Sequence, residues 1–107
     1  MNISFEEFKK IDLRAAKILA AEKVAGSEKL IKLQITLGDE ERQVVAGIAQ
    51  FYQPENLVGR EIIVVANLEP RKLMGLESQG MLLAADDNGQ PVLLNLDREV
   101  PPGSVVK

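Results

Sequence analysis

The sequence predicts an all-β fold, a five-stranded barrel with short helices and a C-terminal extension. Five segments have the apolar character of strands and are separated by turn residues, and the connection between the third and fourth is long enough for a short helix. The 107 residues give room for one domain, and 46% of them are hydrophobic, which is enough for a core. All-β chains of this size commonly close into a barrel because closure removes exposed edges. We expect residues 1 to about 90 to form the barrel with its N-terminal helix, and residues 91–107 to form a strap.

The N-terminal residues predict a short helix followed by a long strand. Ser4 and Glu7 have the spacing of a capping box, which makes Phe5 the first helical residue, and we expect the helix to end near Lys10. Between residues 12 and 24 the apolar positions change phase. Such a change indicates a strand that contains a bulge or a bend.

The second and third strands form a predicted hairpin. Apolar and polar residues alternate from residue 30 to residue 37, so that one face points inward, with the residues Ile31, Leu33, Ile35 and Leu37. If the turn that follows has three loop residues, Arg42 lies opposite Thr36 and on the same face as Lys32, whereas a four-residue loop reverses this. We favour the three-residue loop.

The second half of the barrel follows a helical connection. Residues 49–57 have the length of a short helix, which Pro54 is expected to break into two pieces. Residues 62–66 and 79–86 are the predicted fourth and fifth strands. Five strands with a helical connection between the third and fourth have the element order of an OB-fold barrel. We therefore predict that fold.

The last part of the chain is an extension that the barrel itself does not require. Asp87-Asn88-Gly89 is a hairpin turn signal, and residues 92–94 have the character of an added strand. Residues 100–106 are apolar but too rich in proline for a central strand. This segment either covers one end of the barrel or forms an interface with another chain.

The segment between the predicted fourth and fifth strands carries the strongest functional signal. Arg71 and Lys72 are adjacent cations on a loop that starts at Pro70 and is anchored at both ends by apolar strands. Gly75 permits a sharp reversal of the chain, and Gly80 has no side chain to keep another molecule away. Such cation pairs are commonly solvated charges, but a loop of this kind also suits close contact with a phosphate backbone.

A longer string around these cations resembles the signature of the tRNA-binding domain family. The string is Asn67-Leu68-Glu69-Pro70-Arg71-Lys72-Leu73-Met74-Gly75-Leu76-Glu77-Ser78-Gln79-Gly80-Met81. The family includes the C-terminal appendage of methionyl-tRNA synthetases, a free-standing dimeric tRNA-binding protein and a domain of the phenylalanyl enzyme's β chain. The similarity covers essentially the whole chain, through Asp12-Leu13-Arg14, Lys29-Leu30, Lys32-Leu33, Val45-Ala46-Gly47-Ile48-Ala49 and Pro101-Pro102-Gly103.

The resemblance implies an OB-fold that recognises the general shape of tRNA at its outer corner, without regard to the anticodon. It implies that the tRNA-binding residues are Lys29, Lys32, Arg42, Asn67, Arg71, Lys72, Ser78, Gln79 and Met81. It also implies a symmetric homodimer in which the C-terminal extension is used in dimerisation. The interface residues are then Val100, Pro101, Pro102, Val105 and Val106.

Composition argues against catalysis. The chain has no cysteine and no histidine, which removes thiolate chemistry, the commonest general base and the commonest metal ligands. The acidic clusters at residues 39–41 and 86–87 sit beside turn residues and are expected to be solvated. We expect no enzyme activity, no cofactor and no metal. No signal peptide or membrane span is recognisable, so we expect a cytoplasmic protein.

Charge and aromatic content limit how RNA would be bound. The net charge of −3 predicts weak, salt-sensitive binding, although the cations at 29, 32, 42, 71 and 72 are expected to converge on one barrel face. Phe5, Phe8 and Phe51 are expected in the core, and Tyr52 is left open. Because no aromatic residue falls on a predicted strand face, base stacking on aromatic rings is not expected. Recognition of a folded RNA by its shape and phosphates remains.

Two alternatives stay open at this point. The family is similar to a small export chaperone that uses the same dimeric barrel to hold unfolded peptides, and such a function requires a sizeable exposed apolar groove. The chain is also interpretable as an excised domain of methionyl-tRNA synthetase. Its partners would then include the catalytic region of that enzyme, in the same or another chain.

Overall fold

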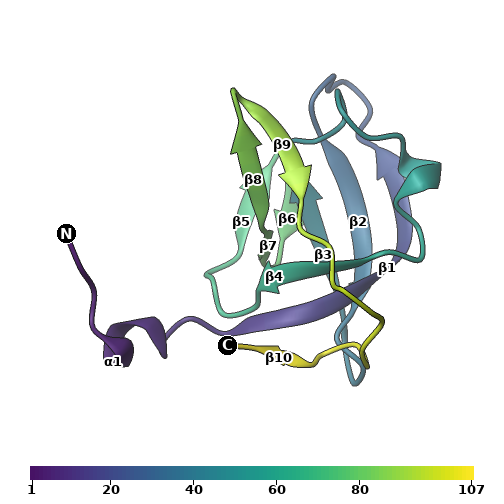
Figure 1. Cartoon of the computed structure of the whole chain (residues 1–107). Coiled ribbons are helices and arrows are strands. Elements are labelled where there is room, and N and C mark those ends of the chain that lie inside the picture. The colour runs from purple at the N-terminus through teal and green to yellow at the C-terminus, as the bar shows by residue number, and fades with distance from the viewer.

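The computed structural model describes all 107 residues and is nearly all-β, as predicted. The elements are α1 (Phe5–Phe8), β1 (Leu13–Lys23), β2 (Ile31–Thr36), β3 (Glu41–Ala46), the 3₁₀ turn η1 (Pro54–Asn56), β4 (Glu61–Val65), β5 (Arg71–Leu73), β6 (Leu76–Ser78), β7 (Met81–Leu82), β8 (Ala84–Asp87), β9 (Gln90–Leu93) and β10 (Val105–Val106). One curled sheet has the strand order β3-β2-β1-β4-β7, with β10 added to β1 (Figure 1). Two small hairpins, β5–β6 and β8–β9, complete the fold.

The core lies inside this curled sheet. On β2 the side chains of Ile31, Leu33 and Ile35 are fully buried, while the residues between them are half-buried, so the predicted alternation is confirmed. β4 pairs with β1 on the side away from β2. It is buried along almost its whole length and contributes to the same core. Each fully buried branched side chain stabilises the fold by about 1.5–3 kcal/mol relative to exposure.

The long strand β1 holds the two halves of the sheet together. Its first half pairs with β4 and its second half with β2, and the register shifts between Ile18 and Ala20. This irregularity confirms the bulge that the phase change predicted. A bulge increases the local twist and lets one strand bend from one side of the barrel to the other.

The β2–β3 hairpin has a different register from the predicted one. Thr36 lies opposite Glu41, and Arg42 lies opposite Ile35, so that the loop has four residues and the three-residue prediction is wrong. Leu37 is buried and its N–H donates to the Glu40 carbonyl at 2.8 Å, which extends the hairpin beyond the strands. Arg42 therefore shares the inward face with Ile35, and Lys32 lies on the outer face.

The connection between β3 and β4 contains less helix than predicted. It consists of a turn after Ile48 and the single 3₁₀ turn η1, which begins at Pro54. Phe51 is 44% exposed, so its predicted place in the core is wrong. Tyr52 packs against the core, and its hydroxyl accepts a hydrogen bond from the N–H of Leu93 at 3.0 Å.

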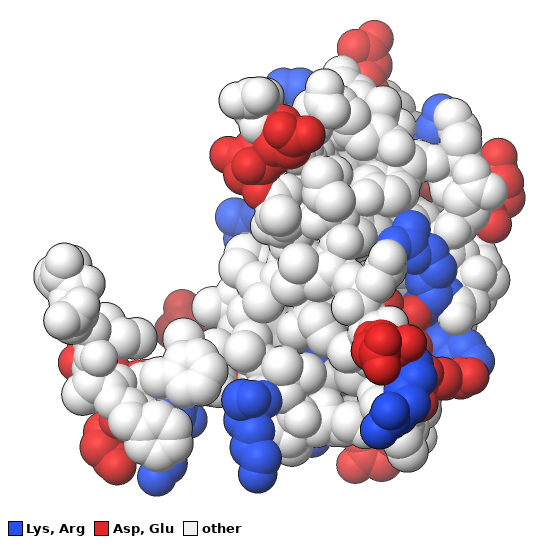
Figure 2. Space-filling model, viewed as in Figure 1, with Lys and Arg blue, Asp and Glu red and all other residues white.

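The N-terminal arm leaves the barrel. Ser4 and Glu7 form the predicted capping box, but α1 ends at Phe8 and buries no residue. Phe5 is 71% exposed and Phe8 is half-buried, so the core prediction is wrong for Phe5 and only partly met for Phe8. The arm projects from the body of the molecule with its apolar side chains uncovered (Figures 1 and 2).

The predicted fifth strand is interrupted. β7 and β8 are separated at Leu83, whose N–H donates to the Ile63 carbonyl at 2.9 Å. β8 then pairs with β9 through the expected turn, in which Asn88 and Gly89 both have positive φ, at 51° and 87°. This is the geometry of a two-residue hairpin turn.

The C-terminal strap folds back onto its own barrel. β10 pairs with β1, and the N–H of Gly103 donates to the Ala15 carbonyl at 2.7 Å. A side chain at Gly103, where φ is +90°, would lie 2.0 Å from the Leu37 carbonyl oxygen, so only glycine fits there. Arg14 donates to the Gly103 carbonyl, and its hydrogen bond to Asp12 raises the pKa of Arg14 above its ordinary value. The strap thus covers one end of the barrel.

Candidate nucleic-acid interface

The segment predicted as a loop between residues 67 and 80 forms a small hairpin. β5 and β6 pair with Arg71 opposite Ser78 and Lys72 opposite Glu77. The turn between them contains Met74 at φ 51° and Gly75 at φ 80°. Glycine adopts such a φ without strain, whereas methionine rarely does. The two adjacent cations therefore stand on paired strands, not on an unstructured loop.

Ser78 attaches this hairpin to β3. Its side-chain oxygen accepts a hydrogen bond from the N–H of Val45 at 3.0 Å and donates to the carbonyl of Gly80, also at 3.0 Å. Ser78 is only 2% exposed, so these contacts are made in the interior. Ser78, one of the predicted tRNA-binding residues, thus satisfies a backbone donor on β3 that would otherwise be unpaired.

Gln79 continues the same attachment. Its side-chain carbonyl accepts from the N–H of Gln43 at 3.1 Å, and its own N–H donates to the Gln43 carbonyl at 2.8 Å. Gln43 in turn donates from its side chain to the Glu77 carbonyl at 2.9 Å. These bonds, two made by side chains and one by the backbone, join β3 to residues Glu77 and Gln79, which lead into β7 at the other end of the sheet.

Asn67 and Arg42 also bond to the backbone of their own chain. Asn67 accepts from the N–H of Asp12 at 2.9 Å and donates to the carbonyl of Lys10 at 2.6 Å, which ties the base of the N-terminal arm to the end of β4. The Arg42 guanidinium donates to the carbonyls of Ala66 and Gln79 and to Glu40. Only 23% of the Arg42 side chain is exposed.

Three of the predicted cations are exposed and form no ion pair within the chain: Lys29, Arg71 and Lys72. Lys29 lies in the loop between β1 and β2, and its carbonyl accepts from the N–H of Ala49 at 2.9 Å. Lys32, on the outer face of β2, is paired with Glu22 at 2.6 Å. In OB-folds the outer faces of the second and third strands and the loops beside them form the oligonucleotide-binding surface.

Met81 lies between two hollows that also share Arg71 and Gly80. One hollow, of about 350 Å³, has mostly hydrophobic walls, which include Leu30, Val45, Leu73 and Met81, and its rim includes Gly47 and Arg71. The other, of about 370 Å³, lies toward Leu68 and Glu69. Met81 itself is 44% exposed.

Apart from Arg71 and Met81, the residues that line the first hollow were not singled out from the sequence as site residues. Leu30, Val45 and Gly47 fall within segments that carry the family resemblance, but their apolar character suggested only core packing. The one available signal was Gly47, a glycine that does not belong to a turn signal.

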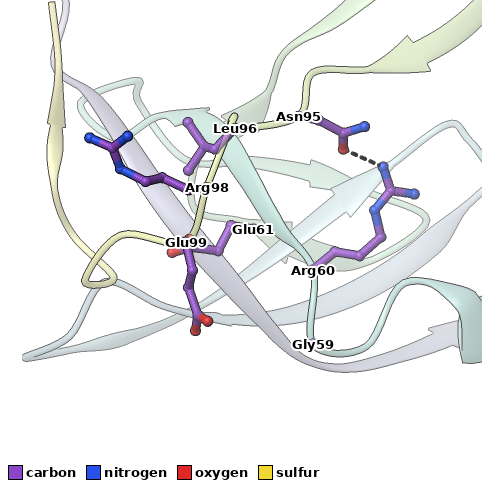
Figure 3. Close-up of a pocket in the computed structure, with 7 residues that line it drawn as sticks. All are labelled: Gly59, Arg60, Glu61, Asn95, Leu96, Arg98 and Glu99. Atoms are coloured by element: carbon purple, nitrogen blue, oxygen red, sulfur yellow. Dashed lines mark hydrogen bonds between the residues drawn. The ribbon is translucent and has the colours of Figure 1, made fainter.

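A further hollow of about 310 Å³ lies beside the strap, between the start of β4 and the segment from Asn95 to Glu99 (Figure 3). Its charged groups are mostly engaged. Arg60 bonds to Asn95 at 2.8 Å, Glu61 accepts from the N–H of Val100 at 2.8 Å, and Glu99 pairs with Lys17 at 3.6 Å. Because its two arginines are balanced by two glutamates, this hollow offers no excess positive charge to a phosphate.

Charge is unevenly spread over the surface. On the face seen in Figure 2, acidic side chains gather at the upper left, over the β8–β9 hairpin, and the middle of the face is largely uncharged. β8 carries Asp86 and Asp87, both exposed. The net negative charge is thus partly held by a hairpin that is distinct from β5–β6.

The structure contains neither a cluster of metal-binding side chains nor a membrane-spanning helix. No group of three or more histidine, cysteine, aspartate or glutamate side chains is arranged to hold a metal ion. No helix has the length and apolar character needed to cross a membrane.

A comparison with known protein families shows to which family the chain belongs. Residues 13–105 match the family model described as "Putative tRNA binding domain". The chain belongs to the tRNA-binding domain family. This tRNA-binding domain is 59% identical over 104 residues to the methionine–tRNA ligase of Thermotoga maritima and 55% identical over 104 residues to that of Caldanaerobacter subterraneus. Each alignment covers 97% of the chain but only 16% of the ligase, so the chain spans about a sixth of these relatives.

Solved structures give the same relationship for the fold. The tRNA-binding domain resembles a crystal structure of a MetRS-related protein from Pyrococcus horikoshii, with a TM-score of 0.95, 41% identity and coverage of 100% of this chain and 99% of that one. It also resembles the chaperone CsaA of Bacillus anthracis, with a TM-score of 0.90, 30% identity and full coverage of both chains. The OB-like barrel that the sequence predicted is therefore confirmed.

Proposed function

We propose that this chain is a non-catalytic module that binds folded tRNA on the surface formed by the β5–β6 hairpin, the outer face of β2 and the β1–β2 loop. The observation that carries the proposal is the state of Arg71 and Lys72. Both are exposed, neither forms an ion pair within the chain although Glu77 lies opposite Lys72, and both stand on a hairpin that is fixed to β3 by the buried hydrogen bond of Ser78. Preorganised cations bind phosphate at a smaller entropic cost than flexible ones.

The nine candidate residues divide into two roles under this proposal. Lys29, Lys32, Arg71, Lys72 and Met81 have exposed or half-exposed side chains and contact the RNA directly. Arg42, Asn67, Ser78 and Gln79 are positioning residues, because their polar groups already bond to the protein backbone. These four residues fix the position and orientation of the residues that contact the RNA.

The RNA feature recognised is proposed to be the outer corner of tRNA, as the family resemblance implies. Phosphate contacts alone fix position and orientation but carry no sequence information, so all tRNAs are bound similarly and the anticodon is not read. Folded RNA is commonly recognised in this way, by its shape and its sugar-phosphate backbone. The net charge of −3 makes the interaction weak and sensitive to salt.

The working form is proposed to be a homodimer, with tRNA bound by each copy. The N-terminal arm leaves several large apolar side chains uncovered, including Ile3 and Phe5, which are 60% and 71% exposed. Val105 on the strap is 59% exposed, although β10 is held by β1. The interface would use Val105 together with the other strap residues Val100, Pro101, Pro102 and Val106. Apolar surface that a chain cannot cover alone is typical of an interface.

The proposed biological role is to assist aminoacylation in the cytoplasm. The relatives compared above are methionine–tRNA ligases, of which the chain spans about a sixth. We propose that the module holds tRNA for a methionyl-tRNA synthetase catalytic region, in the same or in another chain. It would contribute binding energy without contributing catalytic groups.

A second candidate function is the binding of unfolded peptides. The similarity to the chaperone CsaA and the apolar hollow beside Met81 favour it. The unpaired cations of the β5–β6 hairpin are not explained by this function, and for that reason tRNA binding is preferred.

Titration against three ligands separates these functions. The purified chain is titrated with an unmodified tRNA transcript, a single-stranded oligonucleotide of equal length and a chemically unfolded polypeptide, each at two salt concentrations. We expect tRNA to bind tightest at both. If the oligonucleotide or the polypeptide binds at least as well as tRNA, the proposed function is wrong.

A further inference from the structure

Gly47 is a glycine that neither the backbone nor the packing of this chain requires. Seven of the eight glycines have positive φ, which favours glycine, and Gly47 is the exception. A Cβ atom placed on Gly47 would meet no other heavy atom within 4 Å. An alanine would therefore fit at this position in the isolated chain. A glycine without an internal reason is typical of a site where another molecule approaches the backbone closely.

Gly47 is one of the residues that line the apolar hollow beside Met81. Val45, Leu73 and Met81 line it as well. Its volume of about 350 Å³ is at the lower end of the range of about 300–1,000 Å³ that is typical of small-ligand sites. It therefore suits one small ring system better than a long chain.

The charge around the hollow indicates which kind of ring system would bind there. Arg71 is the only charged residue among its lining residues, and none of them is acidic. Arg71 is exposed and has no ion-pair partner, so its guanidinium is free to bind an anion at the rim. An apolar slot with one cation at its edge is complementary to a flat base that carries a phosphate.

Met81 adds a specific contact for such a ring. Its side chain is 44% exposed, and a thioether makes favourable contacts with aromatic rings while adapting to their position. Bases in single-stranded loops of folded RNA are often turned out of the stack, and enzymes that flip a base hold it between aromatic or apolar side chains. This also explains how a chain without aromatic residues on the β5–β6 hairpin holds a base.

We propose that the hollow behind Gly47 receives one unstacked nucleobase of the bound RNA, with the adjoining phosphate held by Arg71. This inference rests on the proposed function and adds which part of the RNA is bound, namely one unstacked base. Gly47 keeps the entrance open, and Val45, Leu73 and Met81 form the walls. A fully base-paired RNA has no base to offer to this site, so the preference is for a folded RNA with at least one base turned outward.

The first test blocks the entrance. Gly47→Leu places a side chain in open space, and Gly47→Ala adds only a methyl group at the same position. Ala85→Leu, on the exposed strand β8, is the matched control for an added leucine. We expect Gly47→Leu to weaken binding of an unmodified tRNA transcript by about tenfold, the loss typical of one base contact. Gly47→Ala should weaken it less, Ala85→Leu not at all, and all three thermal midpoints should stay unchanged.

The second test uses the wild-type protein and does not depend on a variant that folds. The tRNA transcript is probed with base-specific reagents that modify unpaired bases, with and without protein. We expect one unpaired base to become protected. Protection of sugars or phosphates alone would overturn the inference, as would unchanged tRNA affinity of a folded Gly47→Leu variant.

The outcomes also separate this inference from the function on which it rests. If the wild-type chain binds tRNA no better than a single strand, the proposed function fails. If wild-type binding prefers tRNA but no base is protected, only the base pocket is wrong. If Gly47→Leu abolishes binding of an unfolded polypeptide while tRNA binding is unchanged, the hollow is a peptide site and the inference is overturned.

Discussion

The side-chain oxygen of Ser78 accepts a hydrogen bond from the backbone N–H of Val45 at 3.0 Å, in a position where only 2% of Ser78 is exposed. A side chain thus takes the place that a backbone carbonyl would hold in a regular β-ladder. The hairpin that carries Arg71 and Lys72 is fixed to the barrel by this contact. The position of the two cations therefore depends on a residue that does not itself reach the surface.

Replacing Ser78 by alanine should destabilise the fold. The substitution leaves the Val45 N–H unpaired in the interior, which costs about 1–3 kcal/mol of unfolding free energy. Denaturant unfolding measures the change. Ser27→Ala is the matched control, because the Ser27 hydroxyl also accepts backbone N–H groups but does so in a turn that is only half-buried. A Ser78→Ala variant as stable as the wild type would show that the hairpin is held by other contacts.

Removing the acid beside Lys32 should strengthen tRNA binding. Glu22 pairs with Lys32 at 2.6 Å, and an exposed pair is worth about 0.2–1 kcal/mol. Glu22→Gln frees the ammonium for phosphate, so affinity should rise by up to about fivefold. The same change in a Lys32→Ala background is the control, measured by titration at one salt concentration. An equal gain in both backgrounds would mean that Glu22 acts through general charge and not through Lys32.

A charge at Val105 should dissociate the proposed dimer without unfolding the chain. Val105 is 59% exposed, so Val105→Lys disturbs little packing within one copy, whereas truncation from Leu93 onward would remove a core side chain. Sedimentation velocity gives the oligomeric state. Val92→Lys, at a 46% exposed site outside the proposed interface, is the control. Should the wild type itself sediment as a monomer, the interface assigned to the strap is wrong.

Glu61 should anchor the strap through one of its two oxygens. Oε1 accepts from the Val100 N–H at 2.8 Å, and Oε2 is buried without a partner. Glu61→Ala leaves the Val100 donor unpaired and should cost about 1–3 kcal/mol of unfolding free energy. Glu61→Gln keeps the acceptor and should cost less. Equal losses for the two variants in denaturant unfolding would exclude this hydrogen bond as the anchor.

The sequence predicted the structure correctly where the periodicity of apolar side chains along one strand is sufficient to determine it. β2 alternates strictly, so its inward face was predictable, and the phase change in β1 revealed the bulge. The hairpin register was not predictable in the same way. It depends on a single loop residue, and the local hydrogen bond between Leu37 and Glu40 favours the longer loop.

The hydrogen-bond partners of the polar candidates Ser78 and Asn67 could not be predicted from the sequence, for a different reason. The partners of Ser78 and Asn67 lie 33 and 55 positions away in the chain, and no local pattern reports such contacts. The exposure of Phe5 was likewise hidden, since an apolar side chain looks the same in sequence whether it packs within one chain or against another. The pair Arg71 and Lys72 could be proposed from the sequence because the residues around it that indicate a site are close in the chain.

The double variant Arg71→Ala, Lys72→Ala tests the central claim most directly, through its tRNA affinity as a function of salt. We predict weaker binding to all tRNAs and a slope of log affinity against log salt that is smaller by somewhat less than about two units. The thermal midpoint should stay the same, because exposed charges usually change stability by no more than about 0.5 kcal/mol. A variant that instead removes two exposed cations elsewhere, Lys10→Ala with Arg98→Ala, should bind nearly as the wild type does. Unchanged affinity and slope in the Arg71→Ala, Lys72→Ala variant would contradict the assignment of the β5–β6 hairpin to RNA.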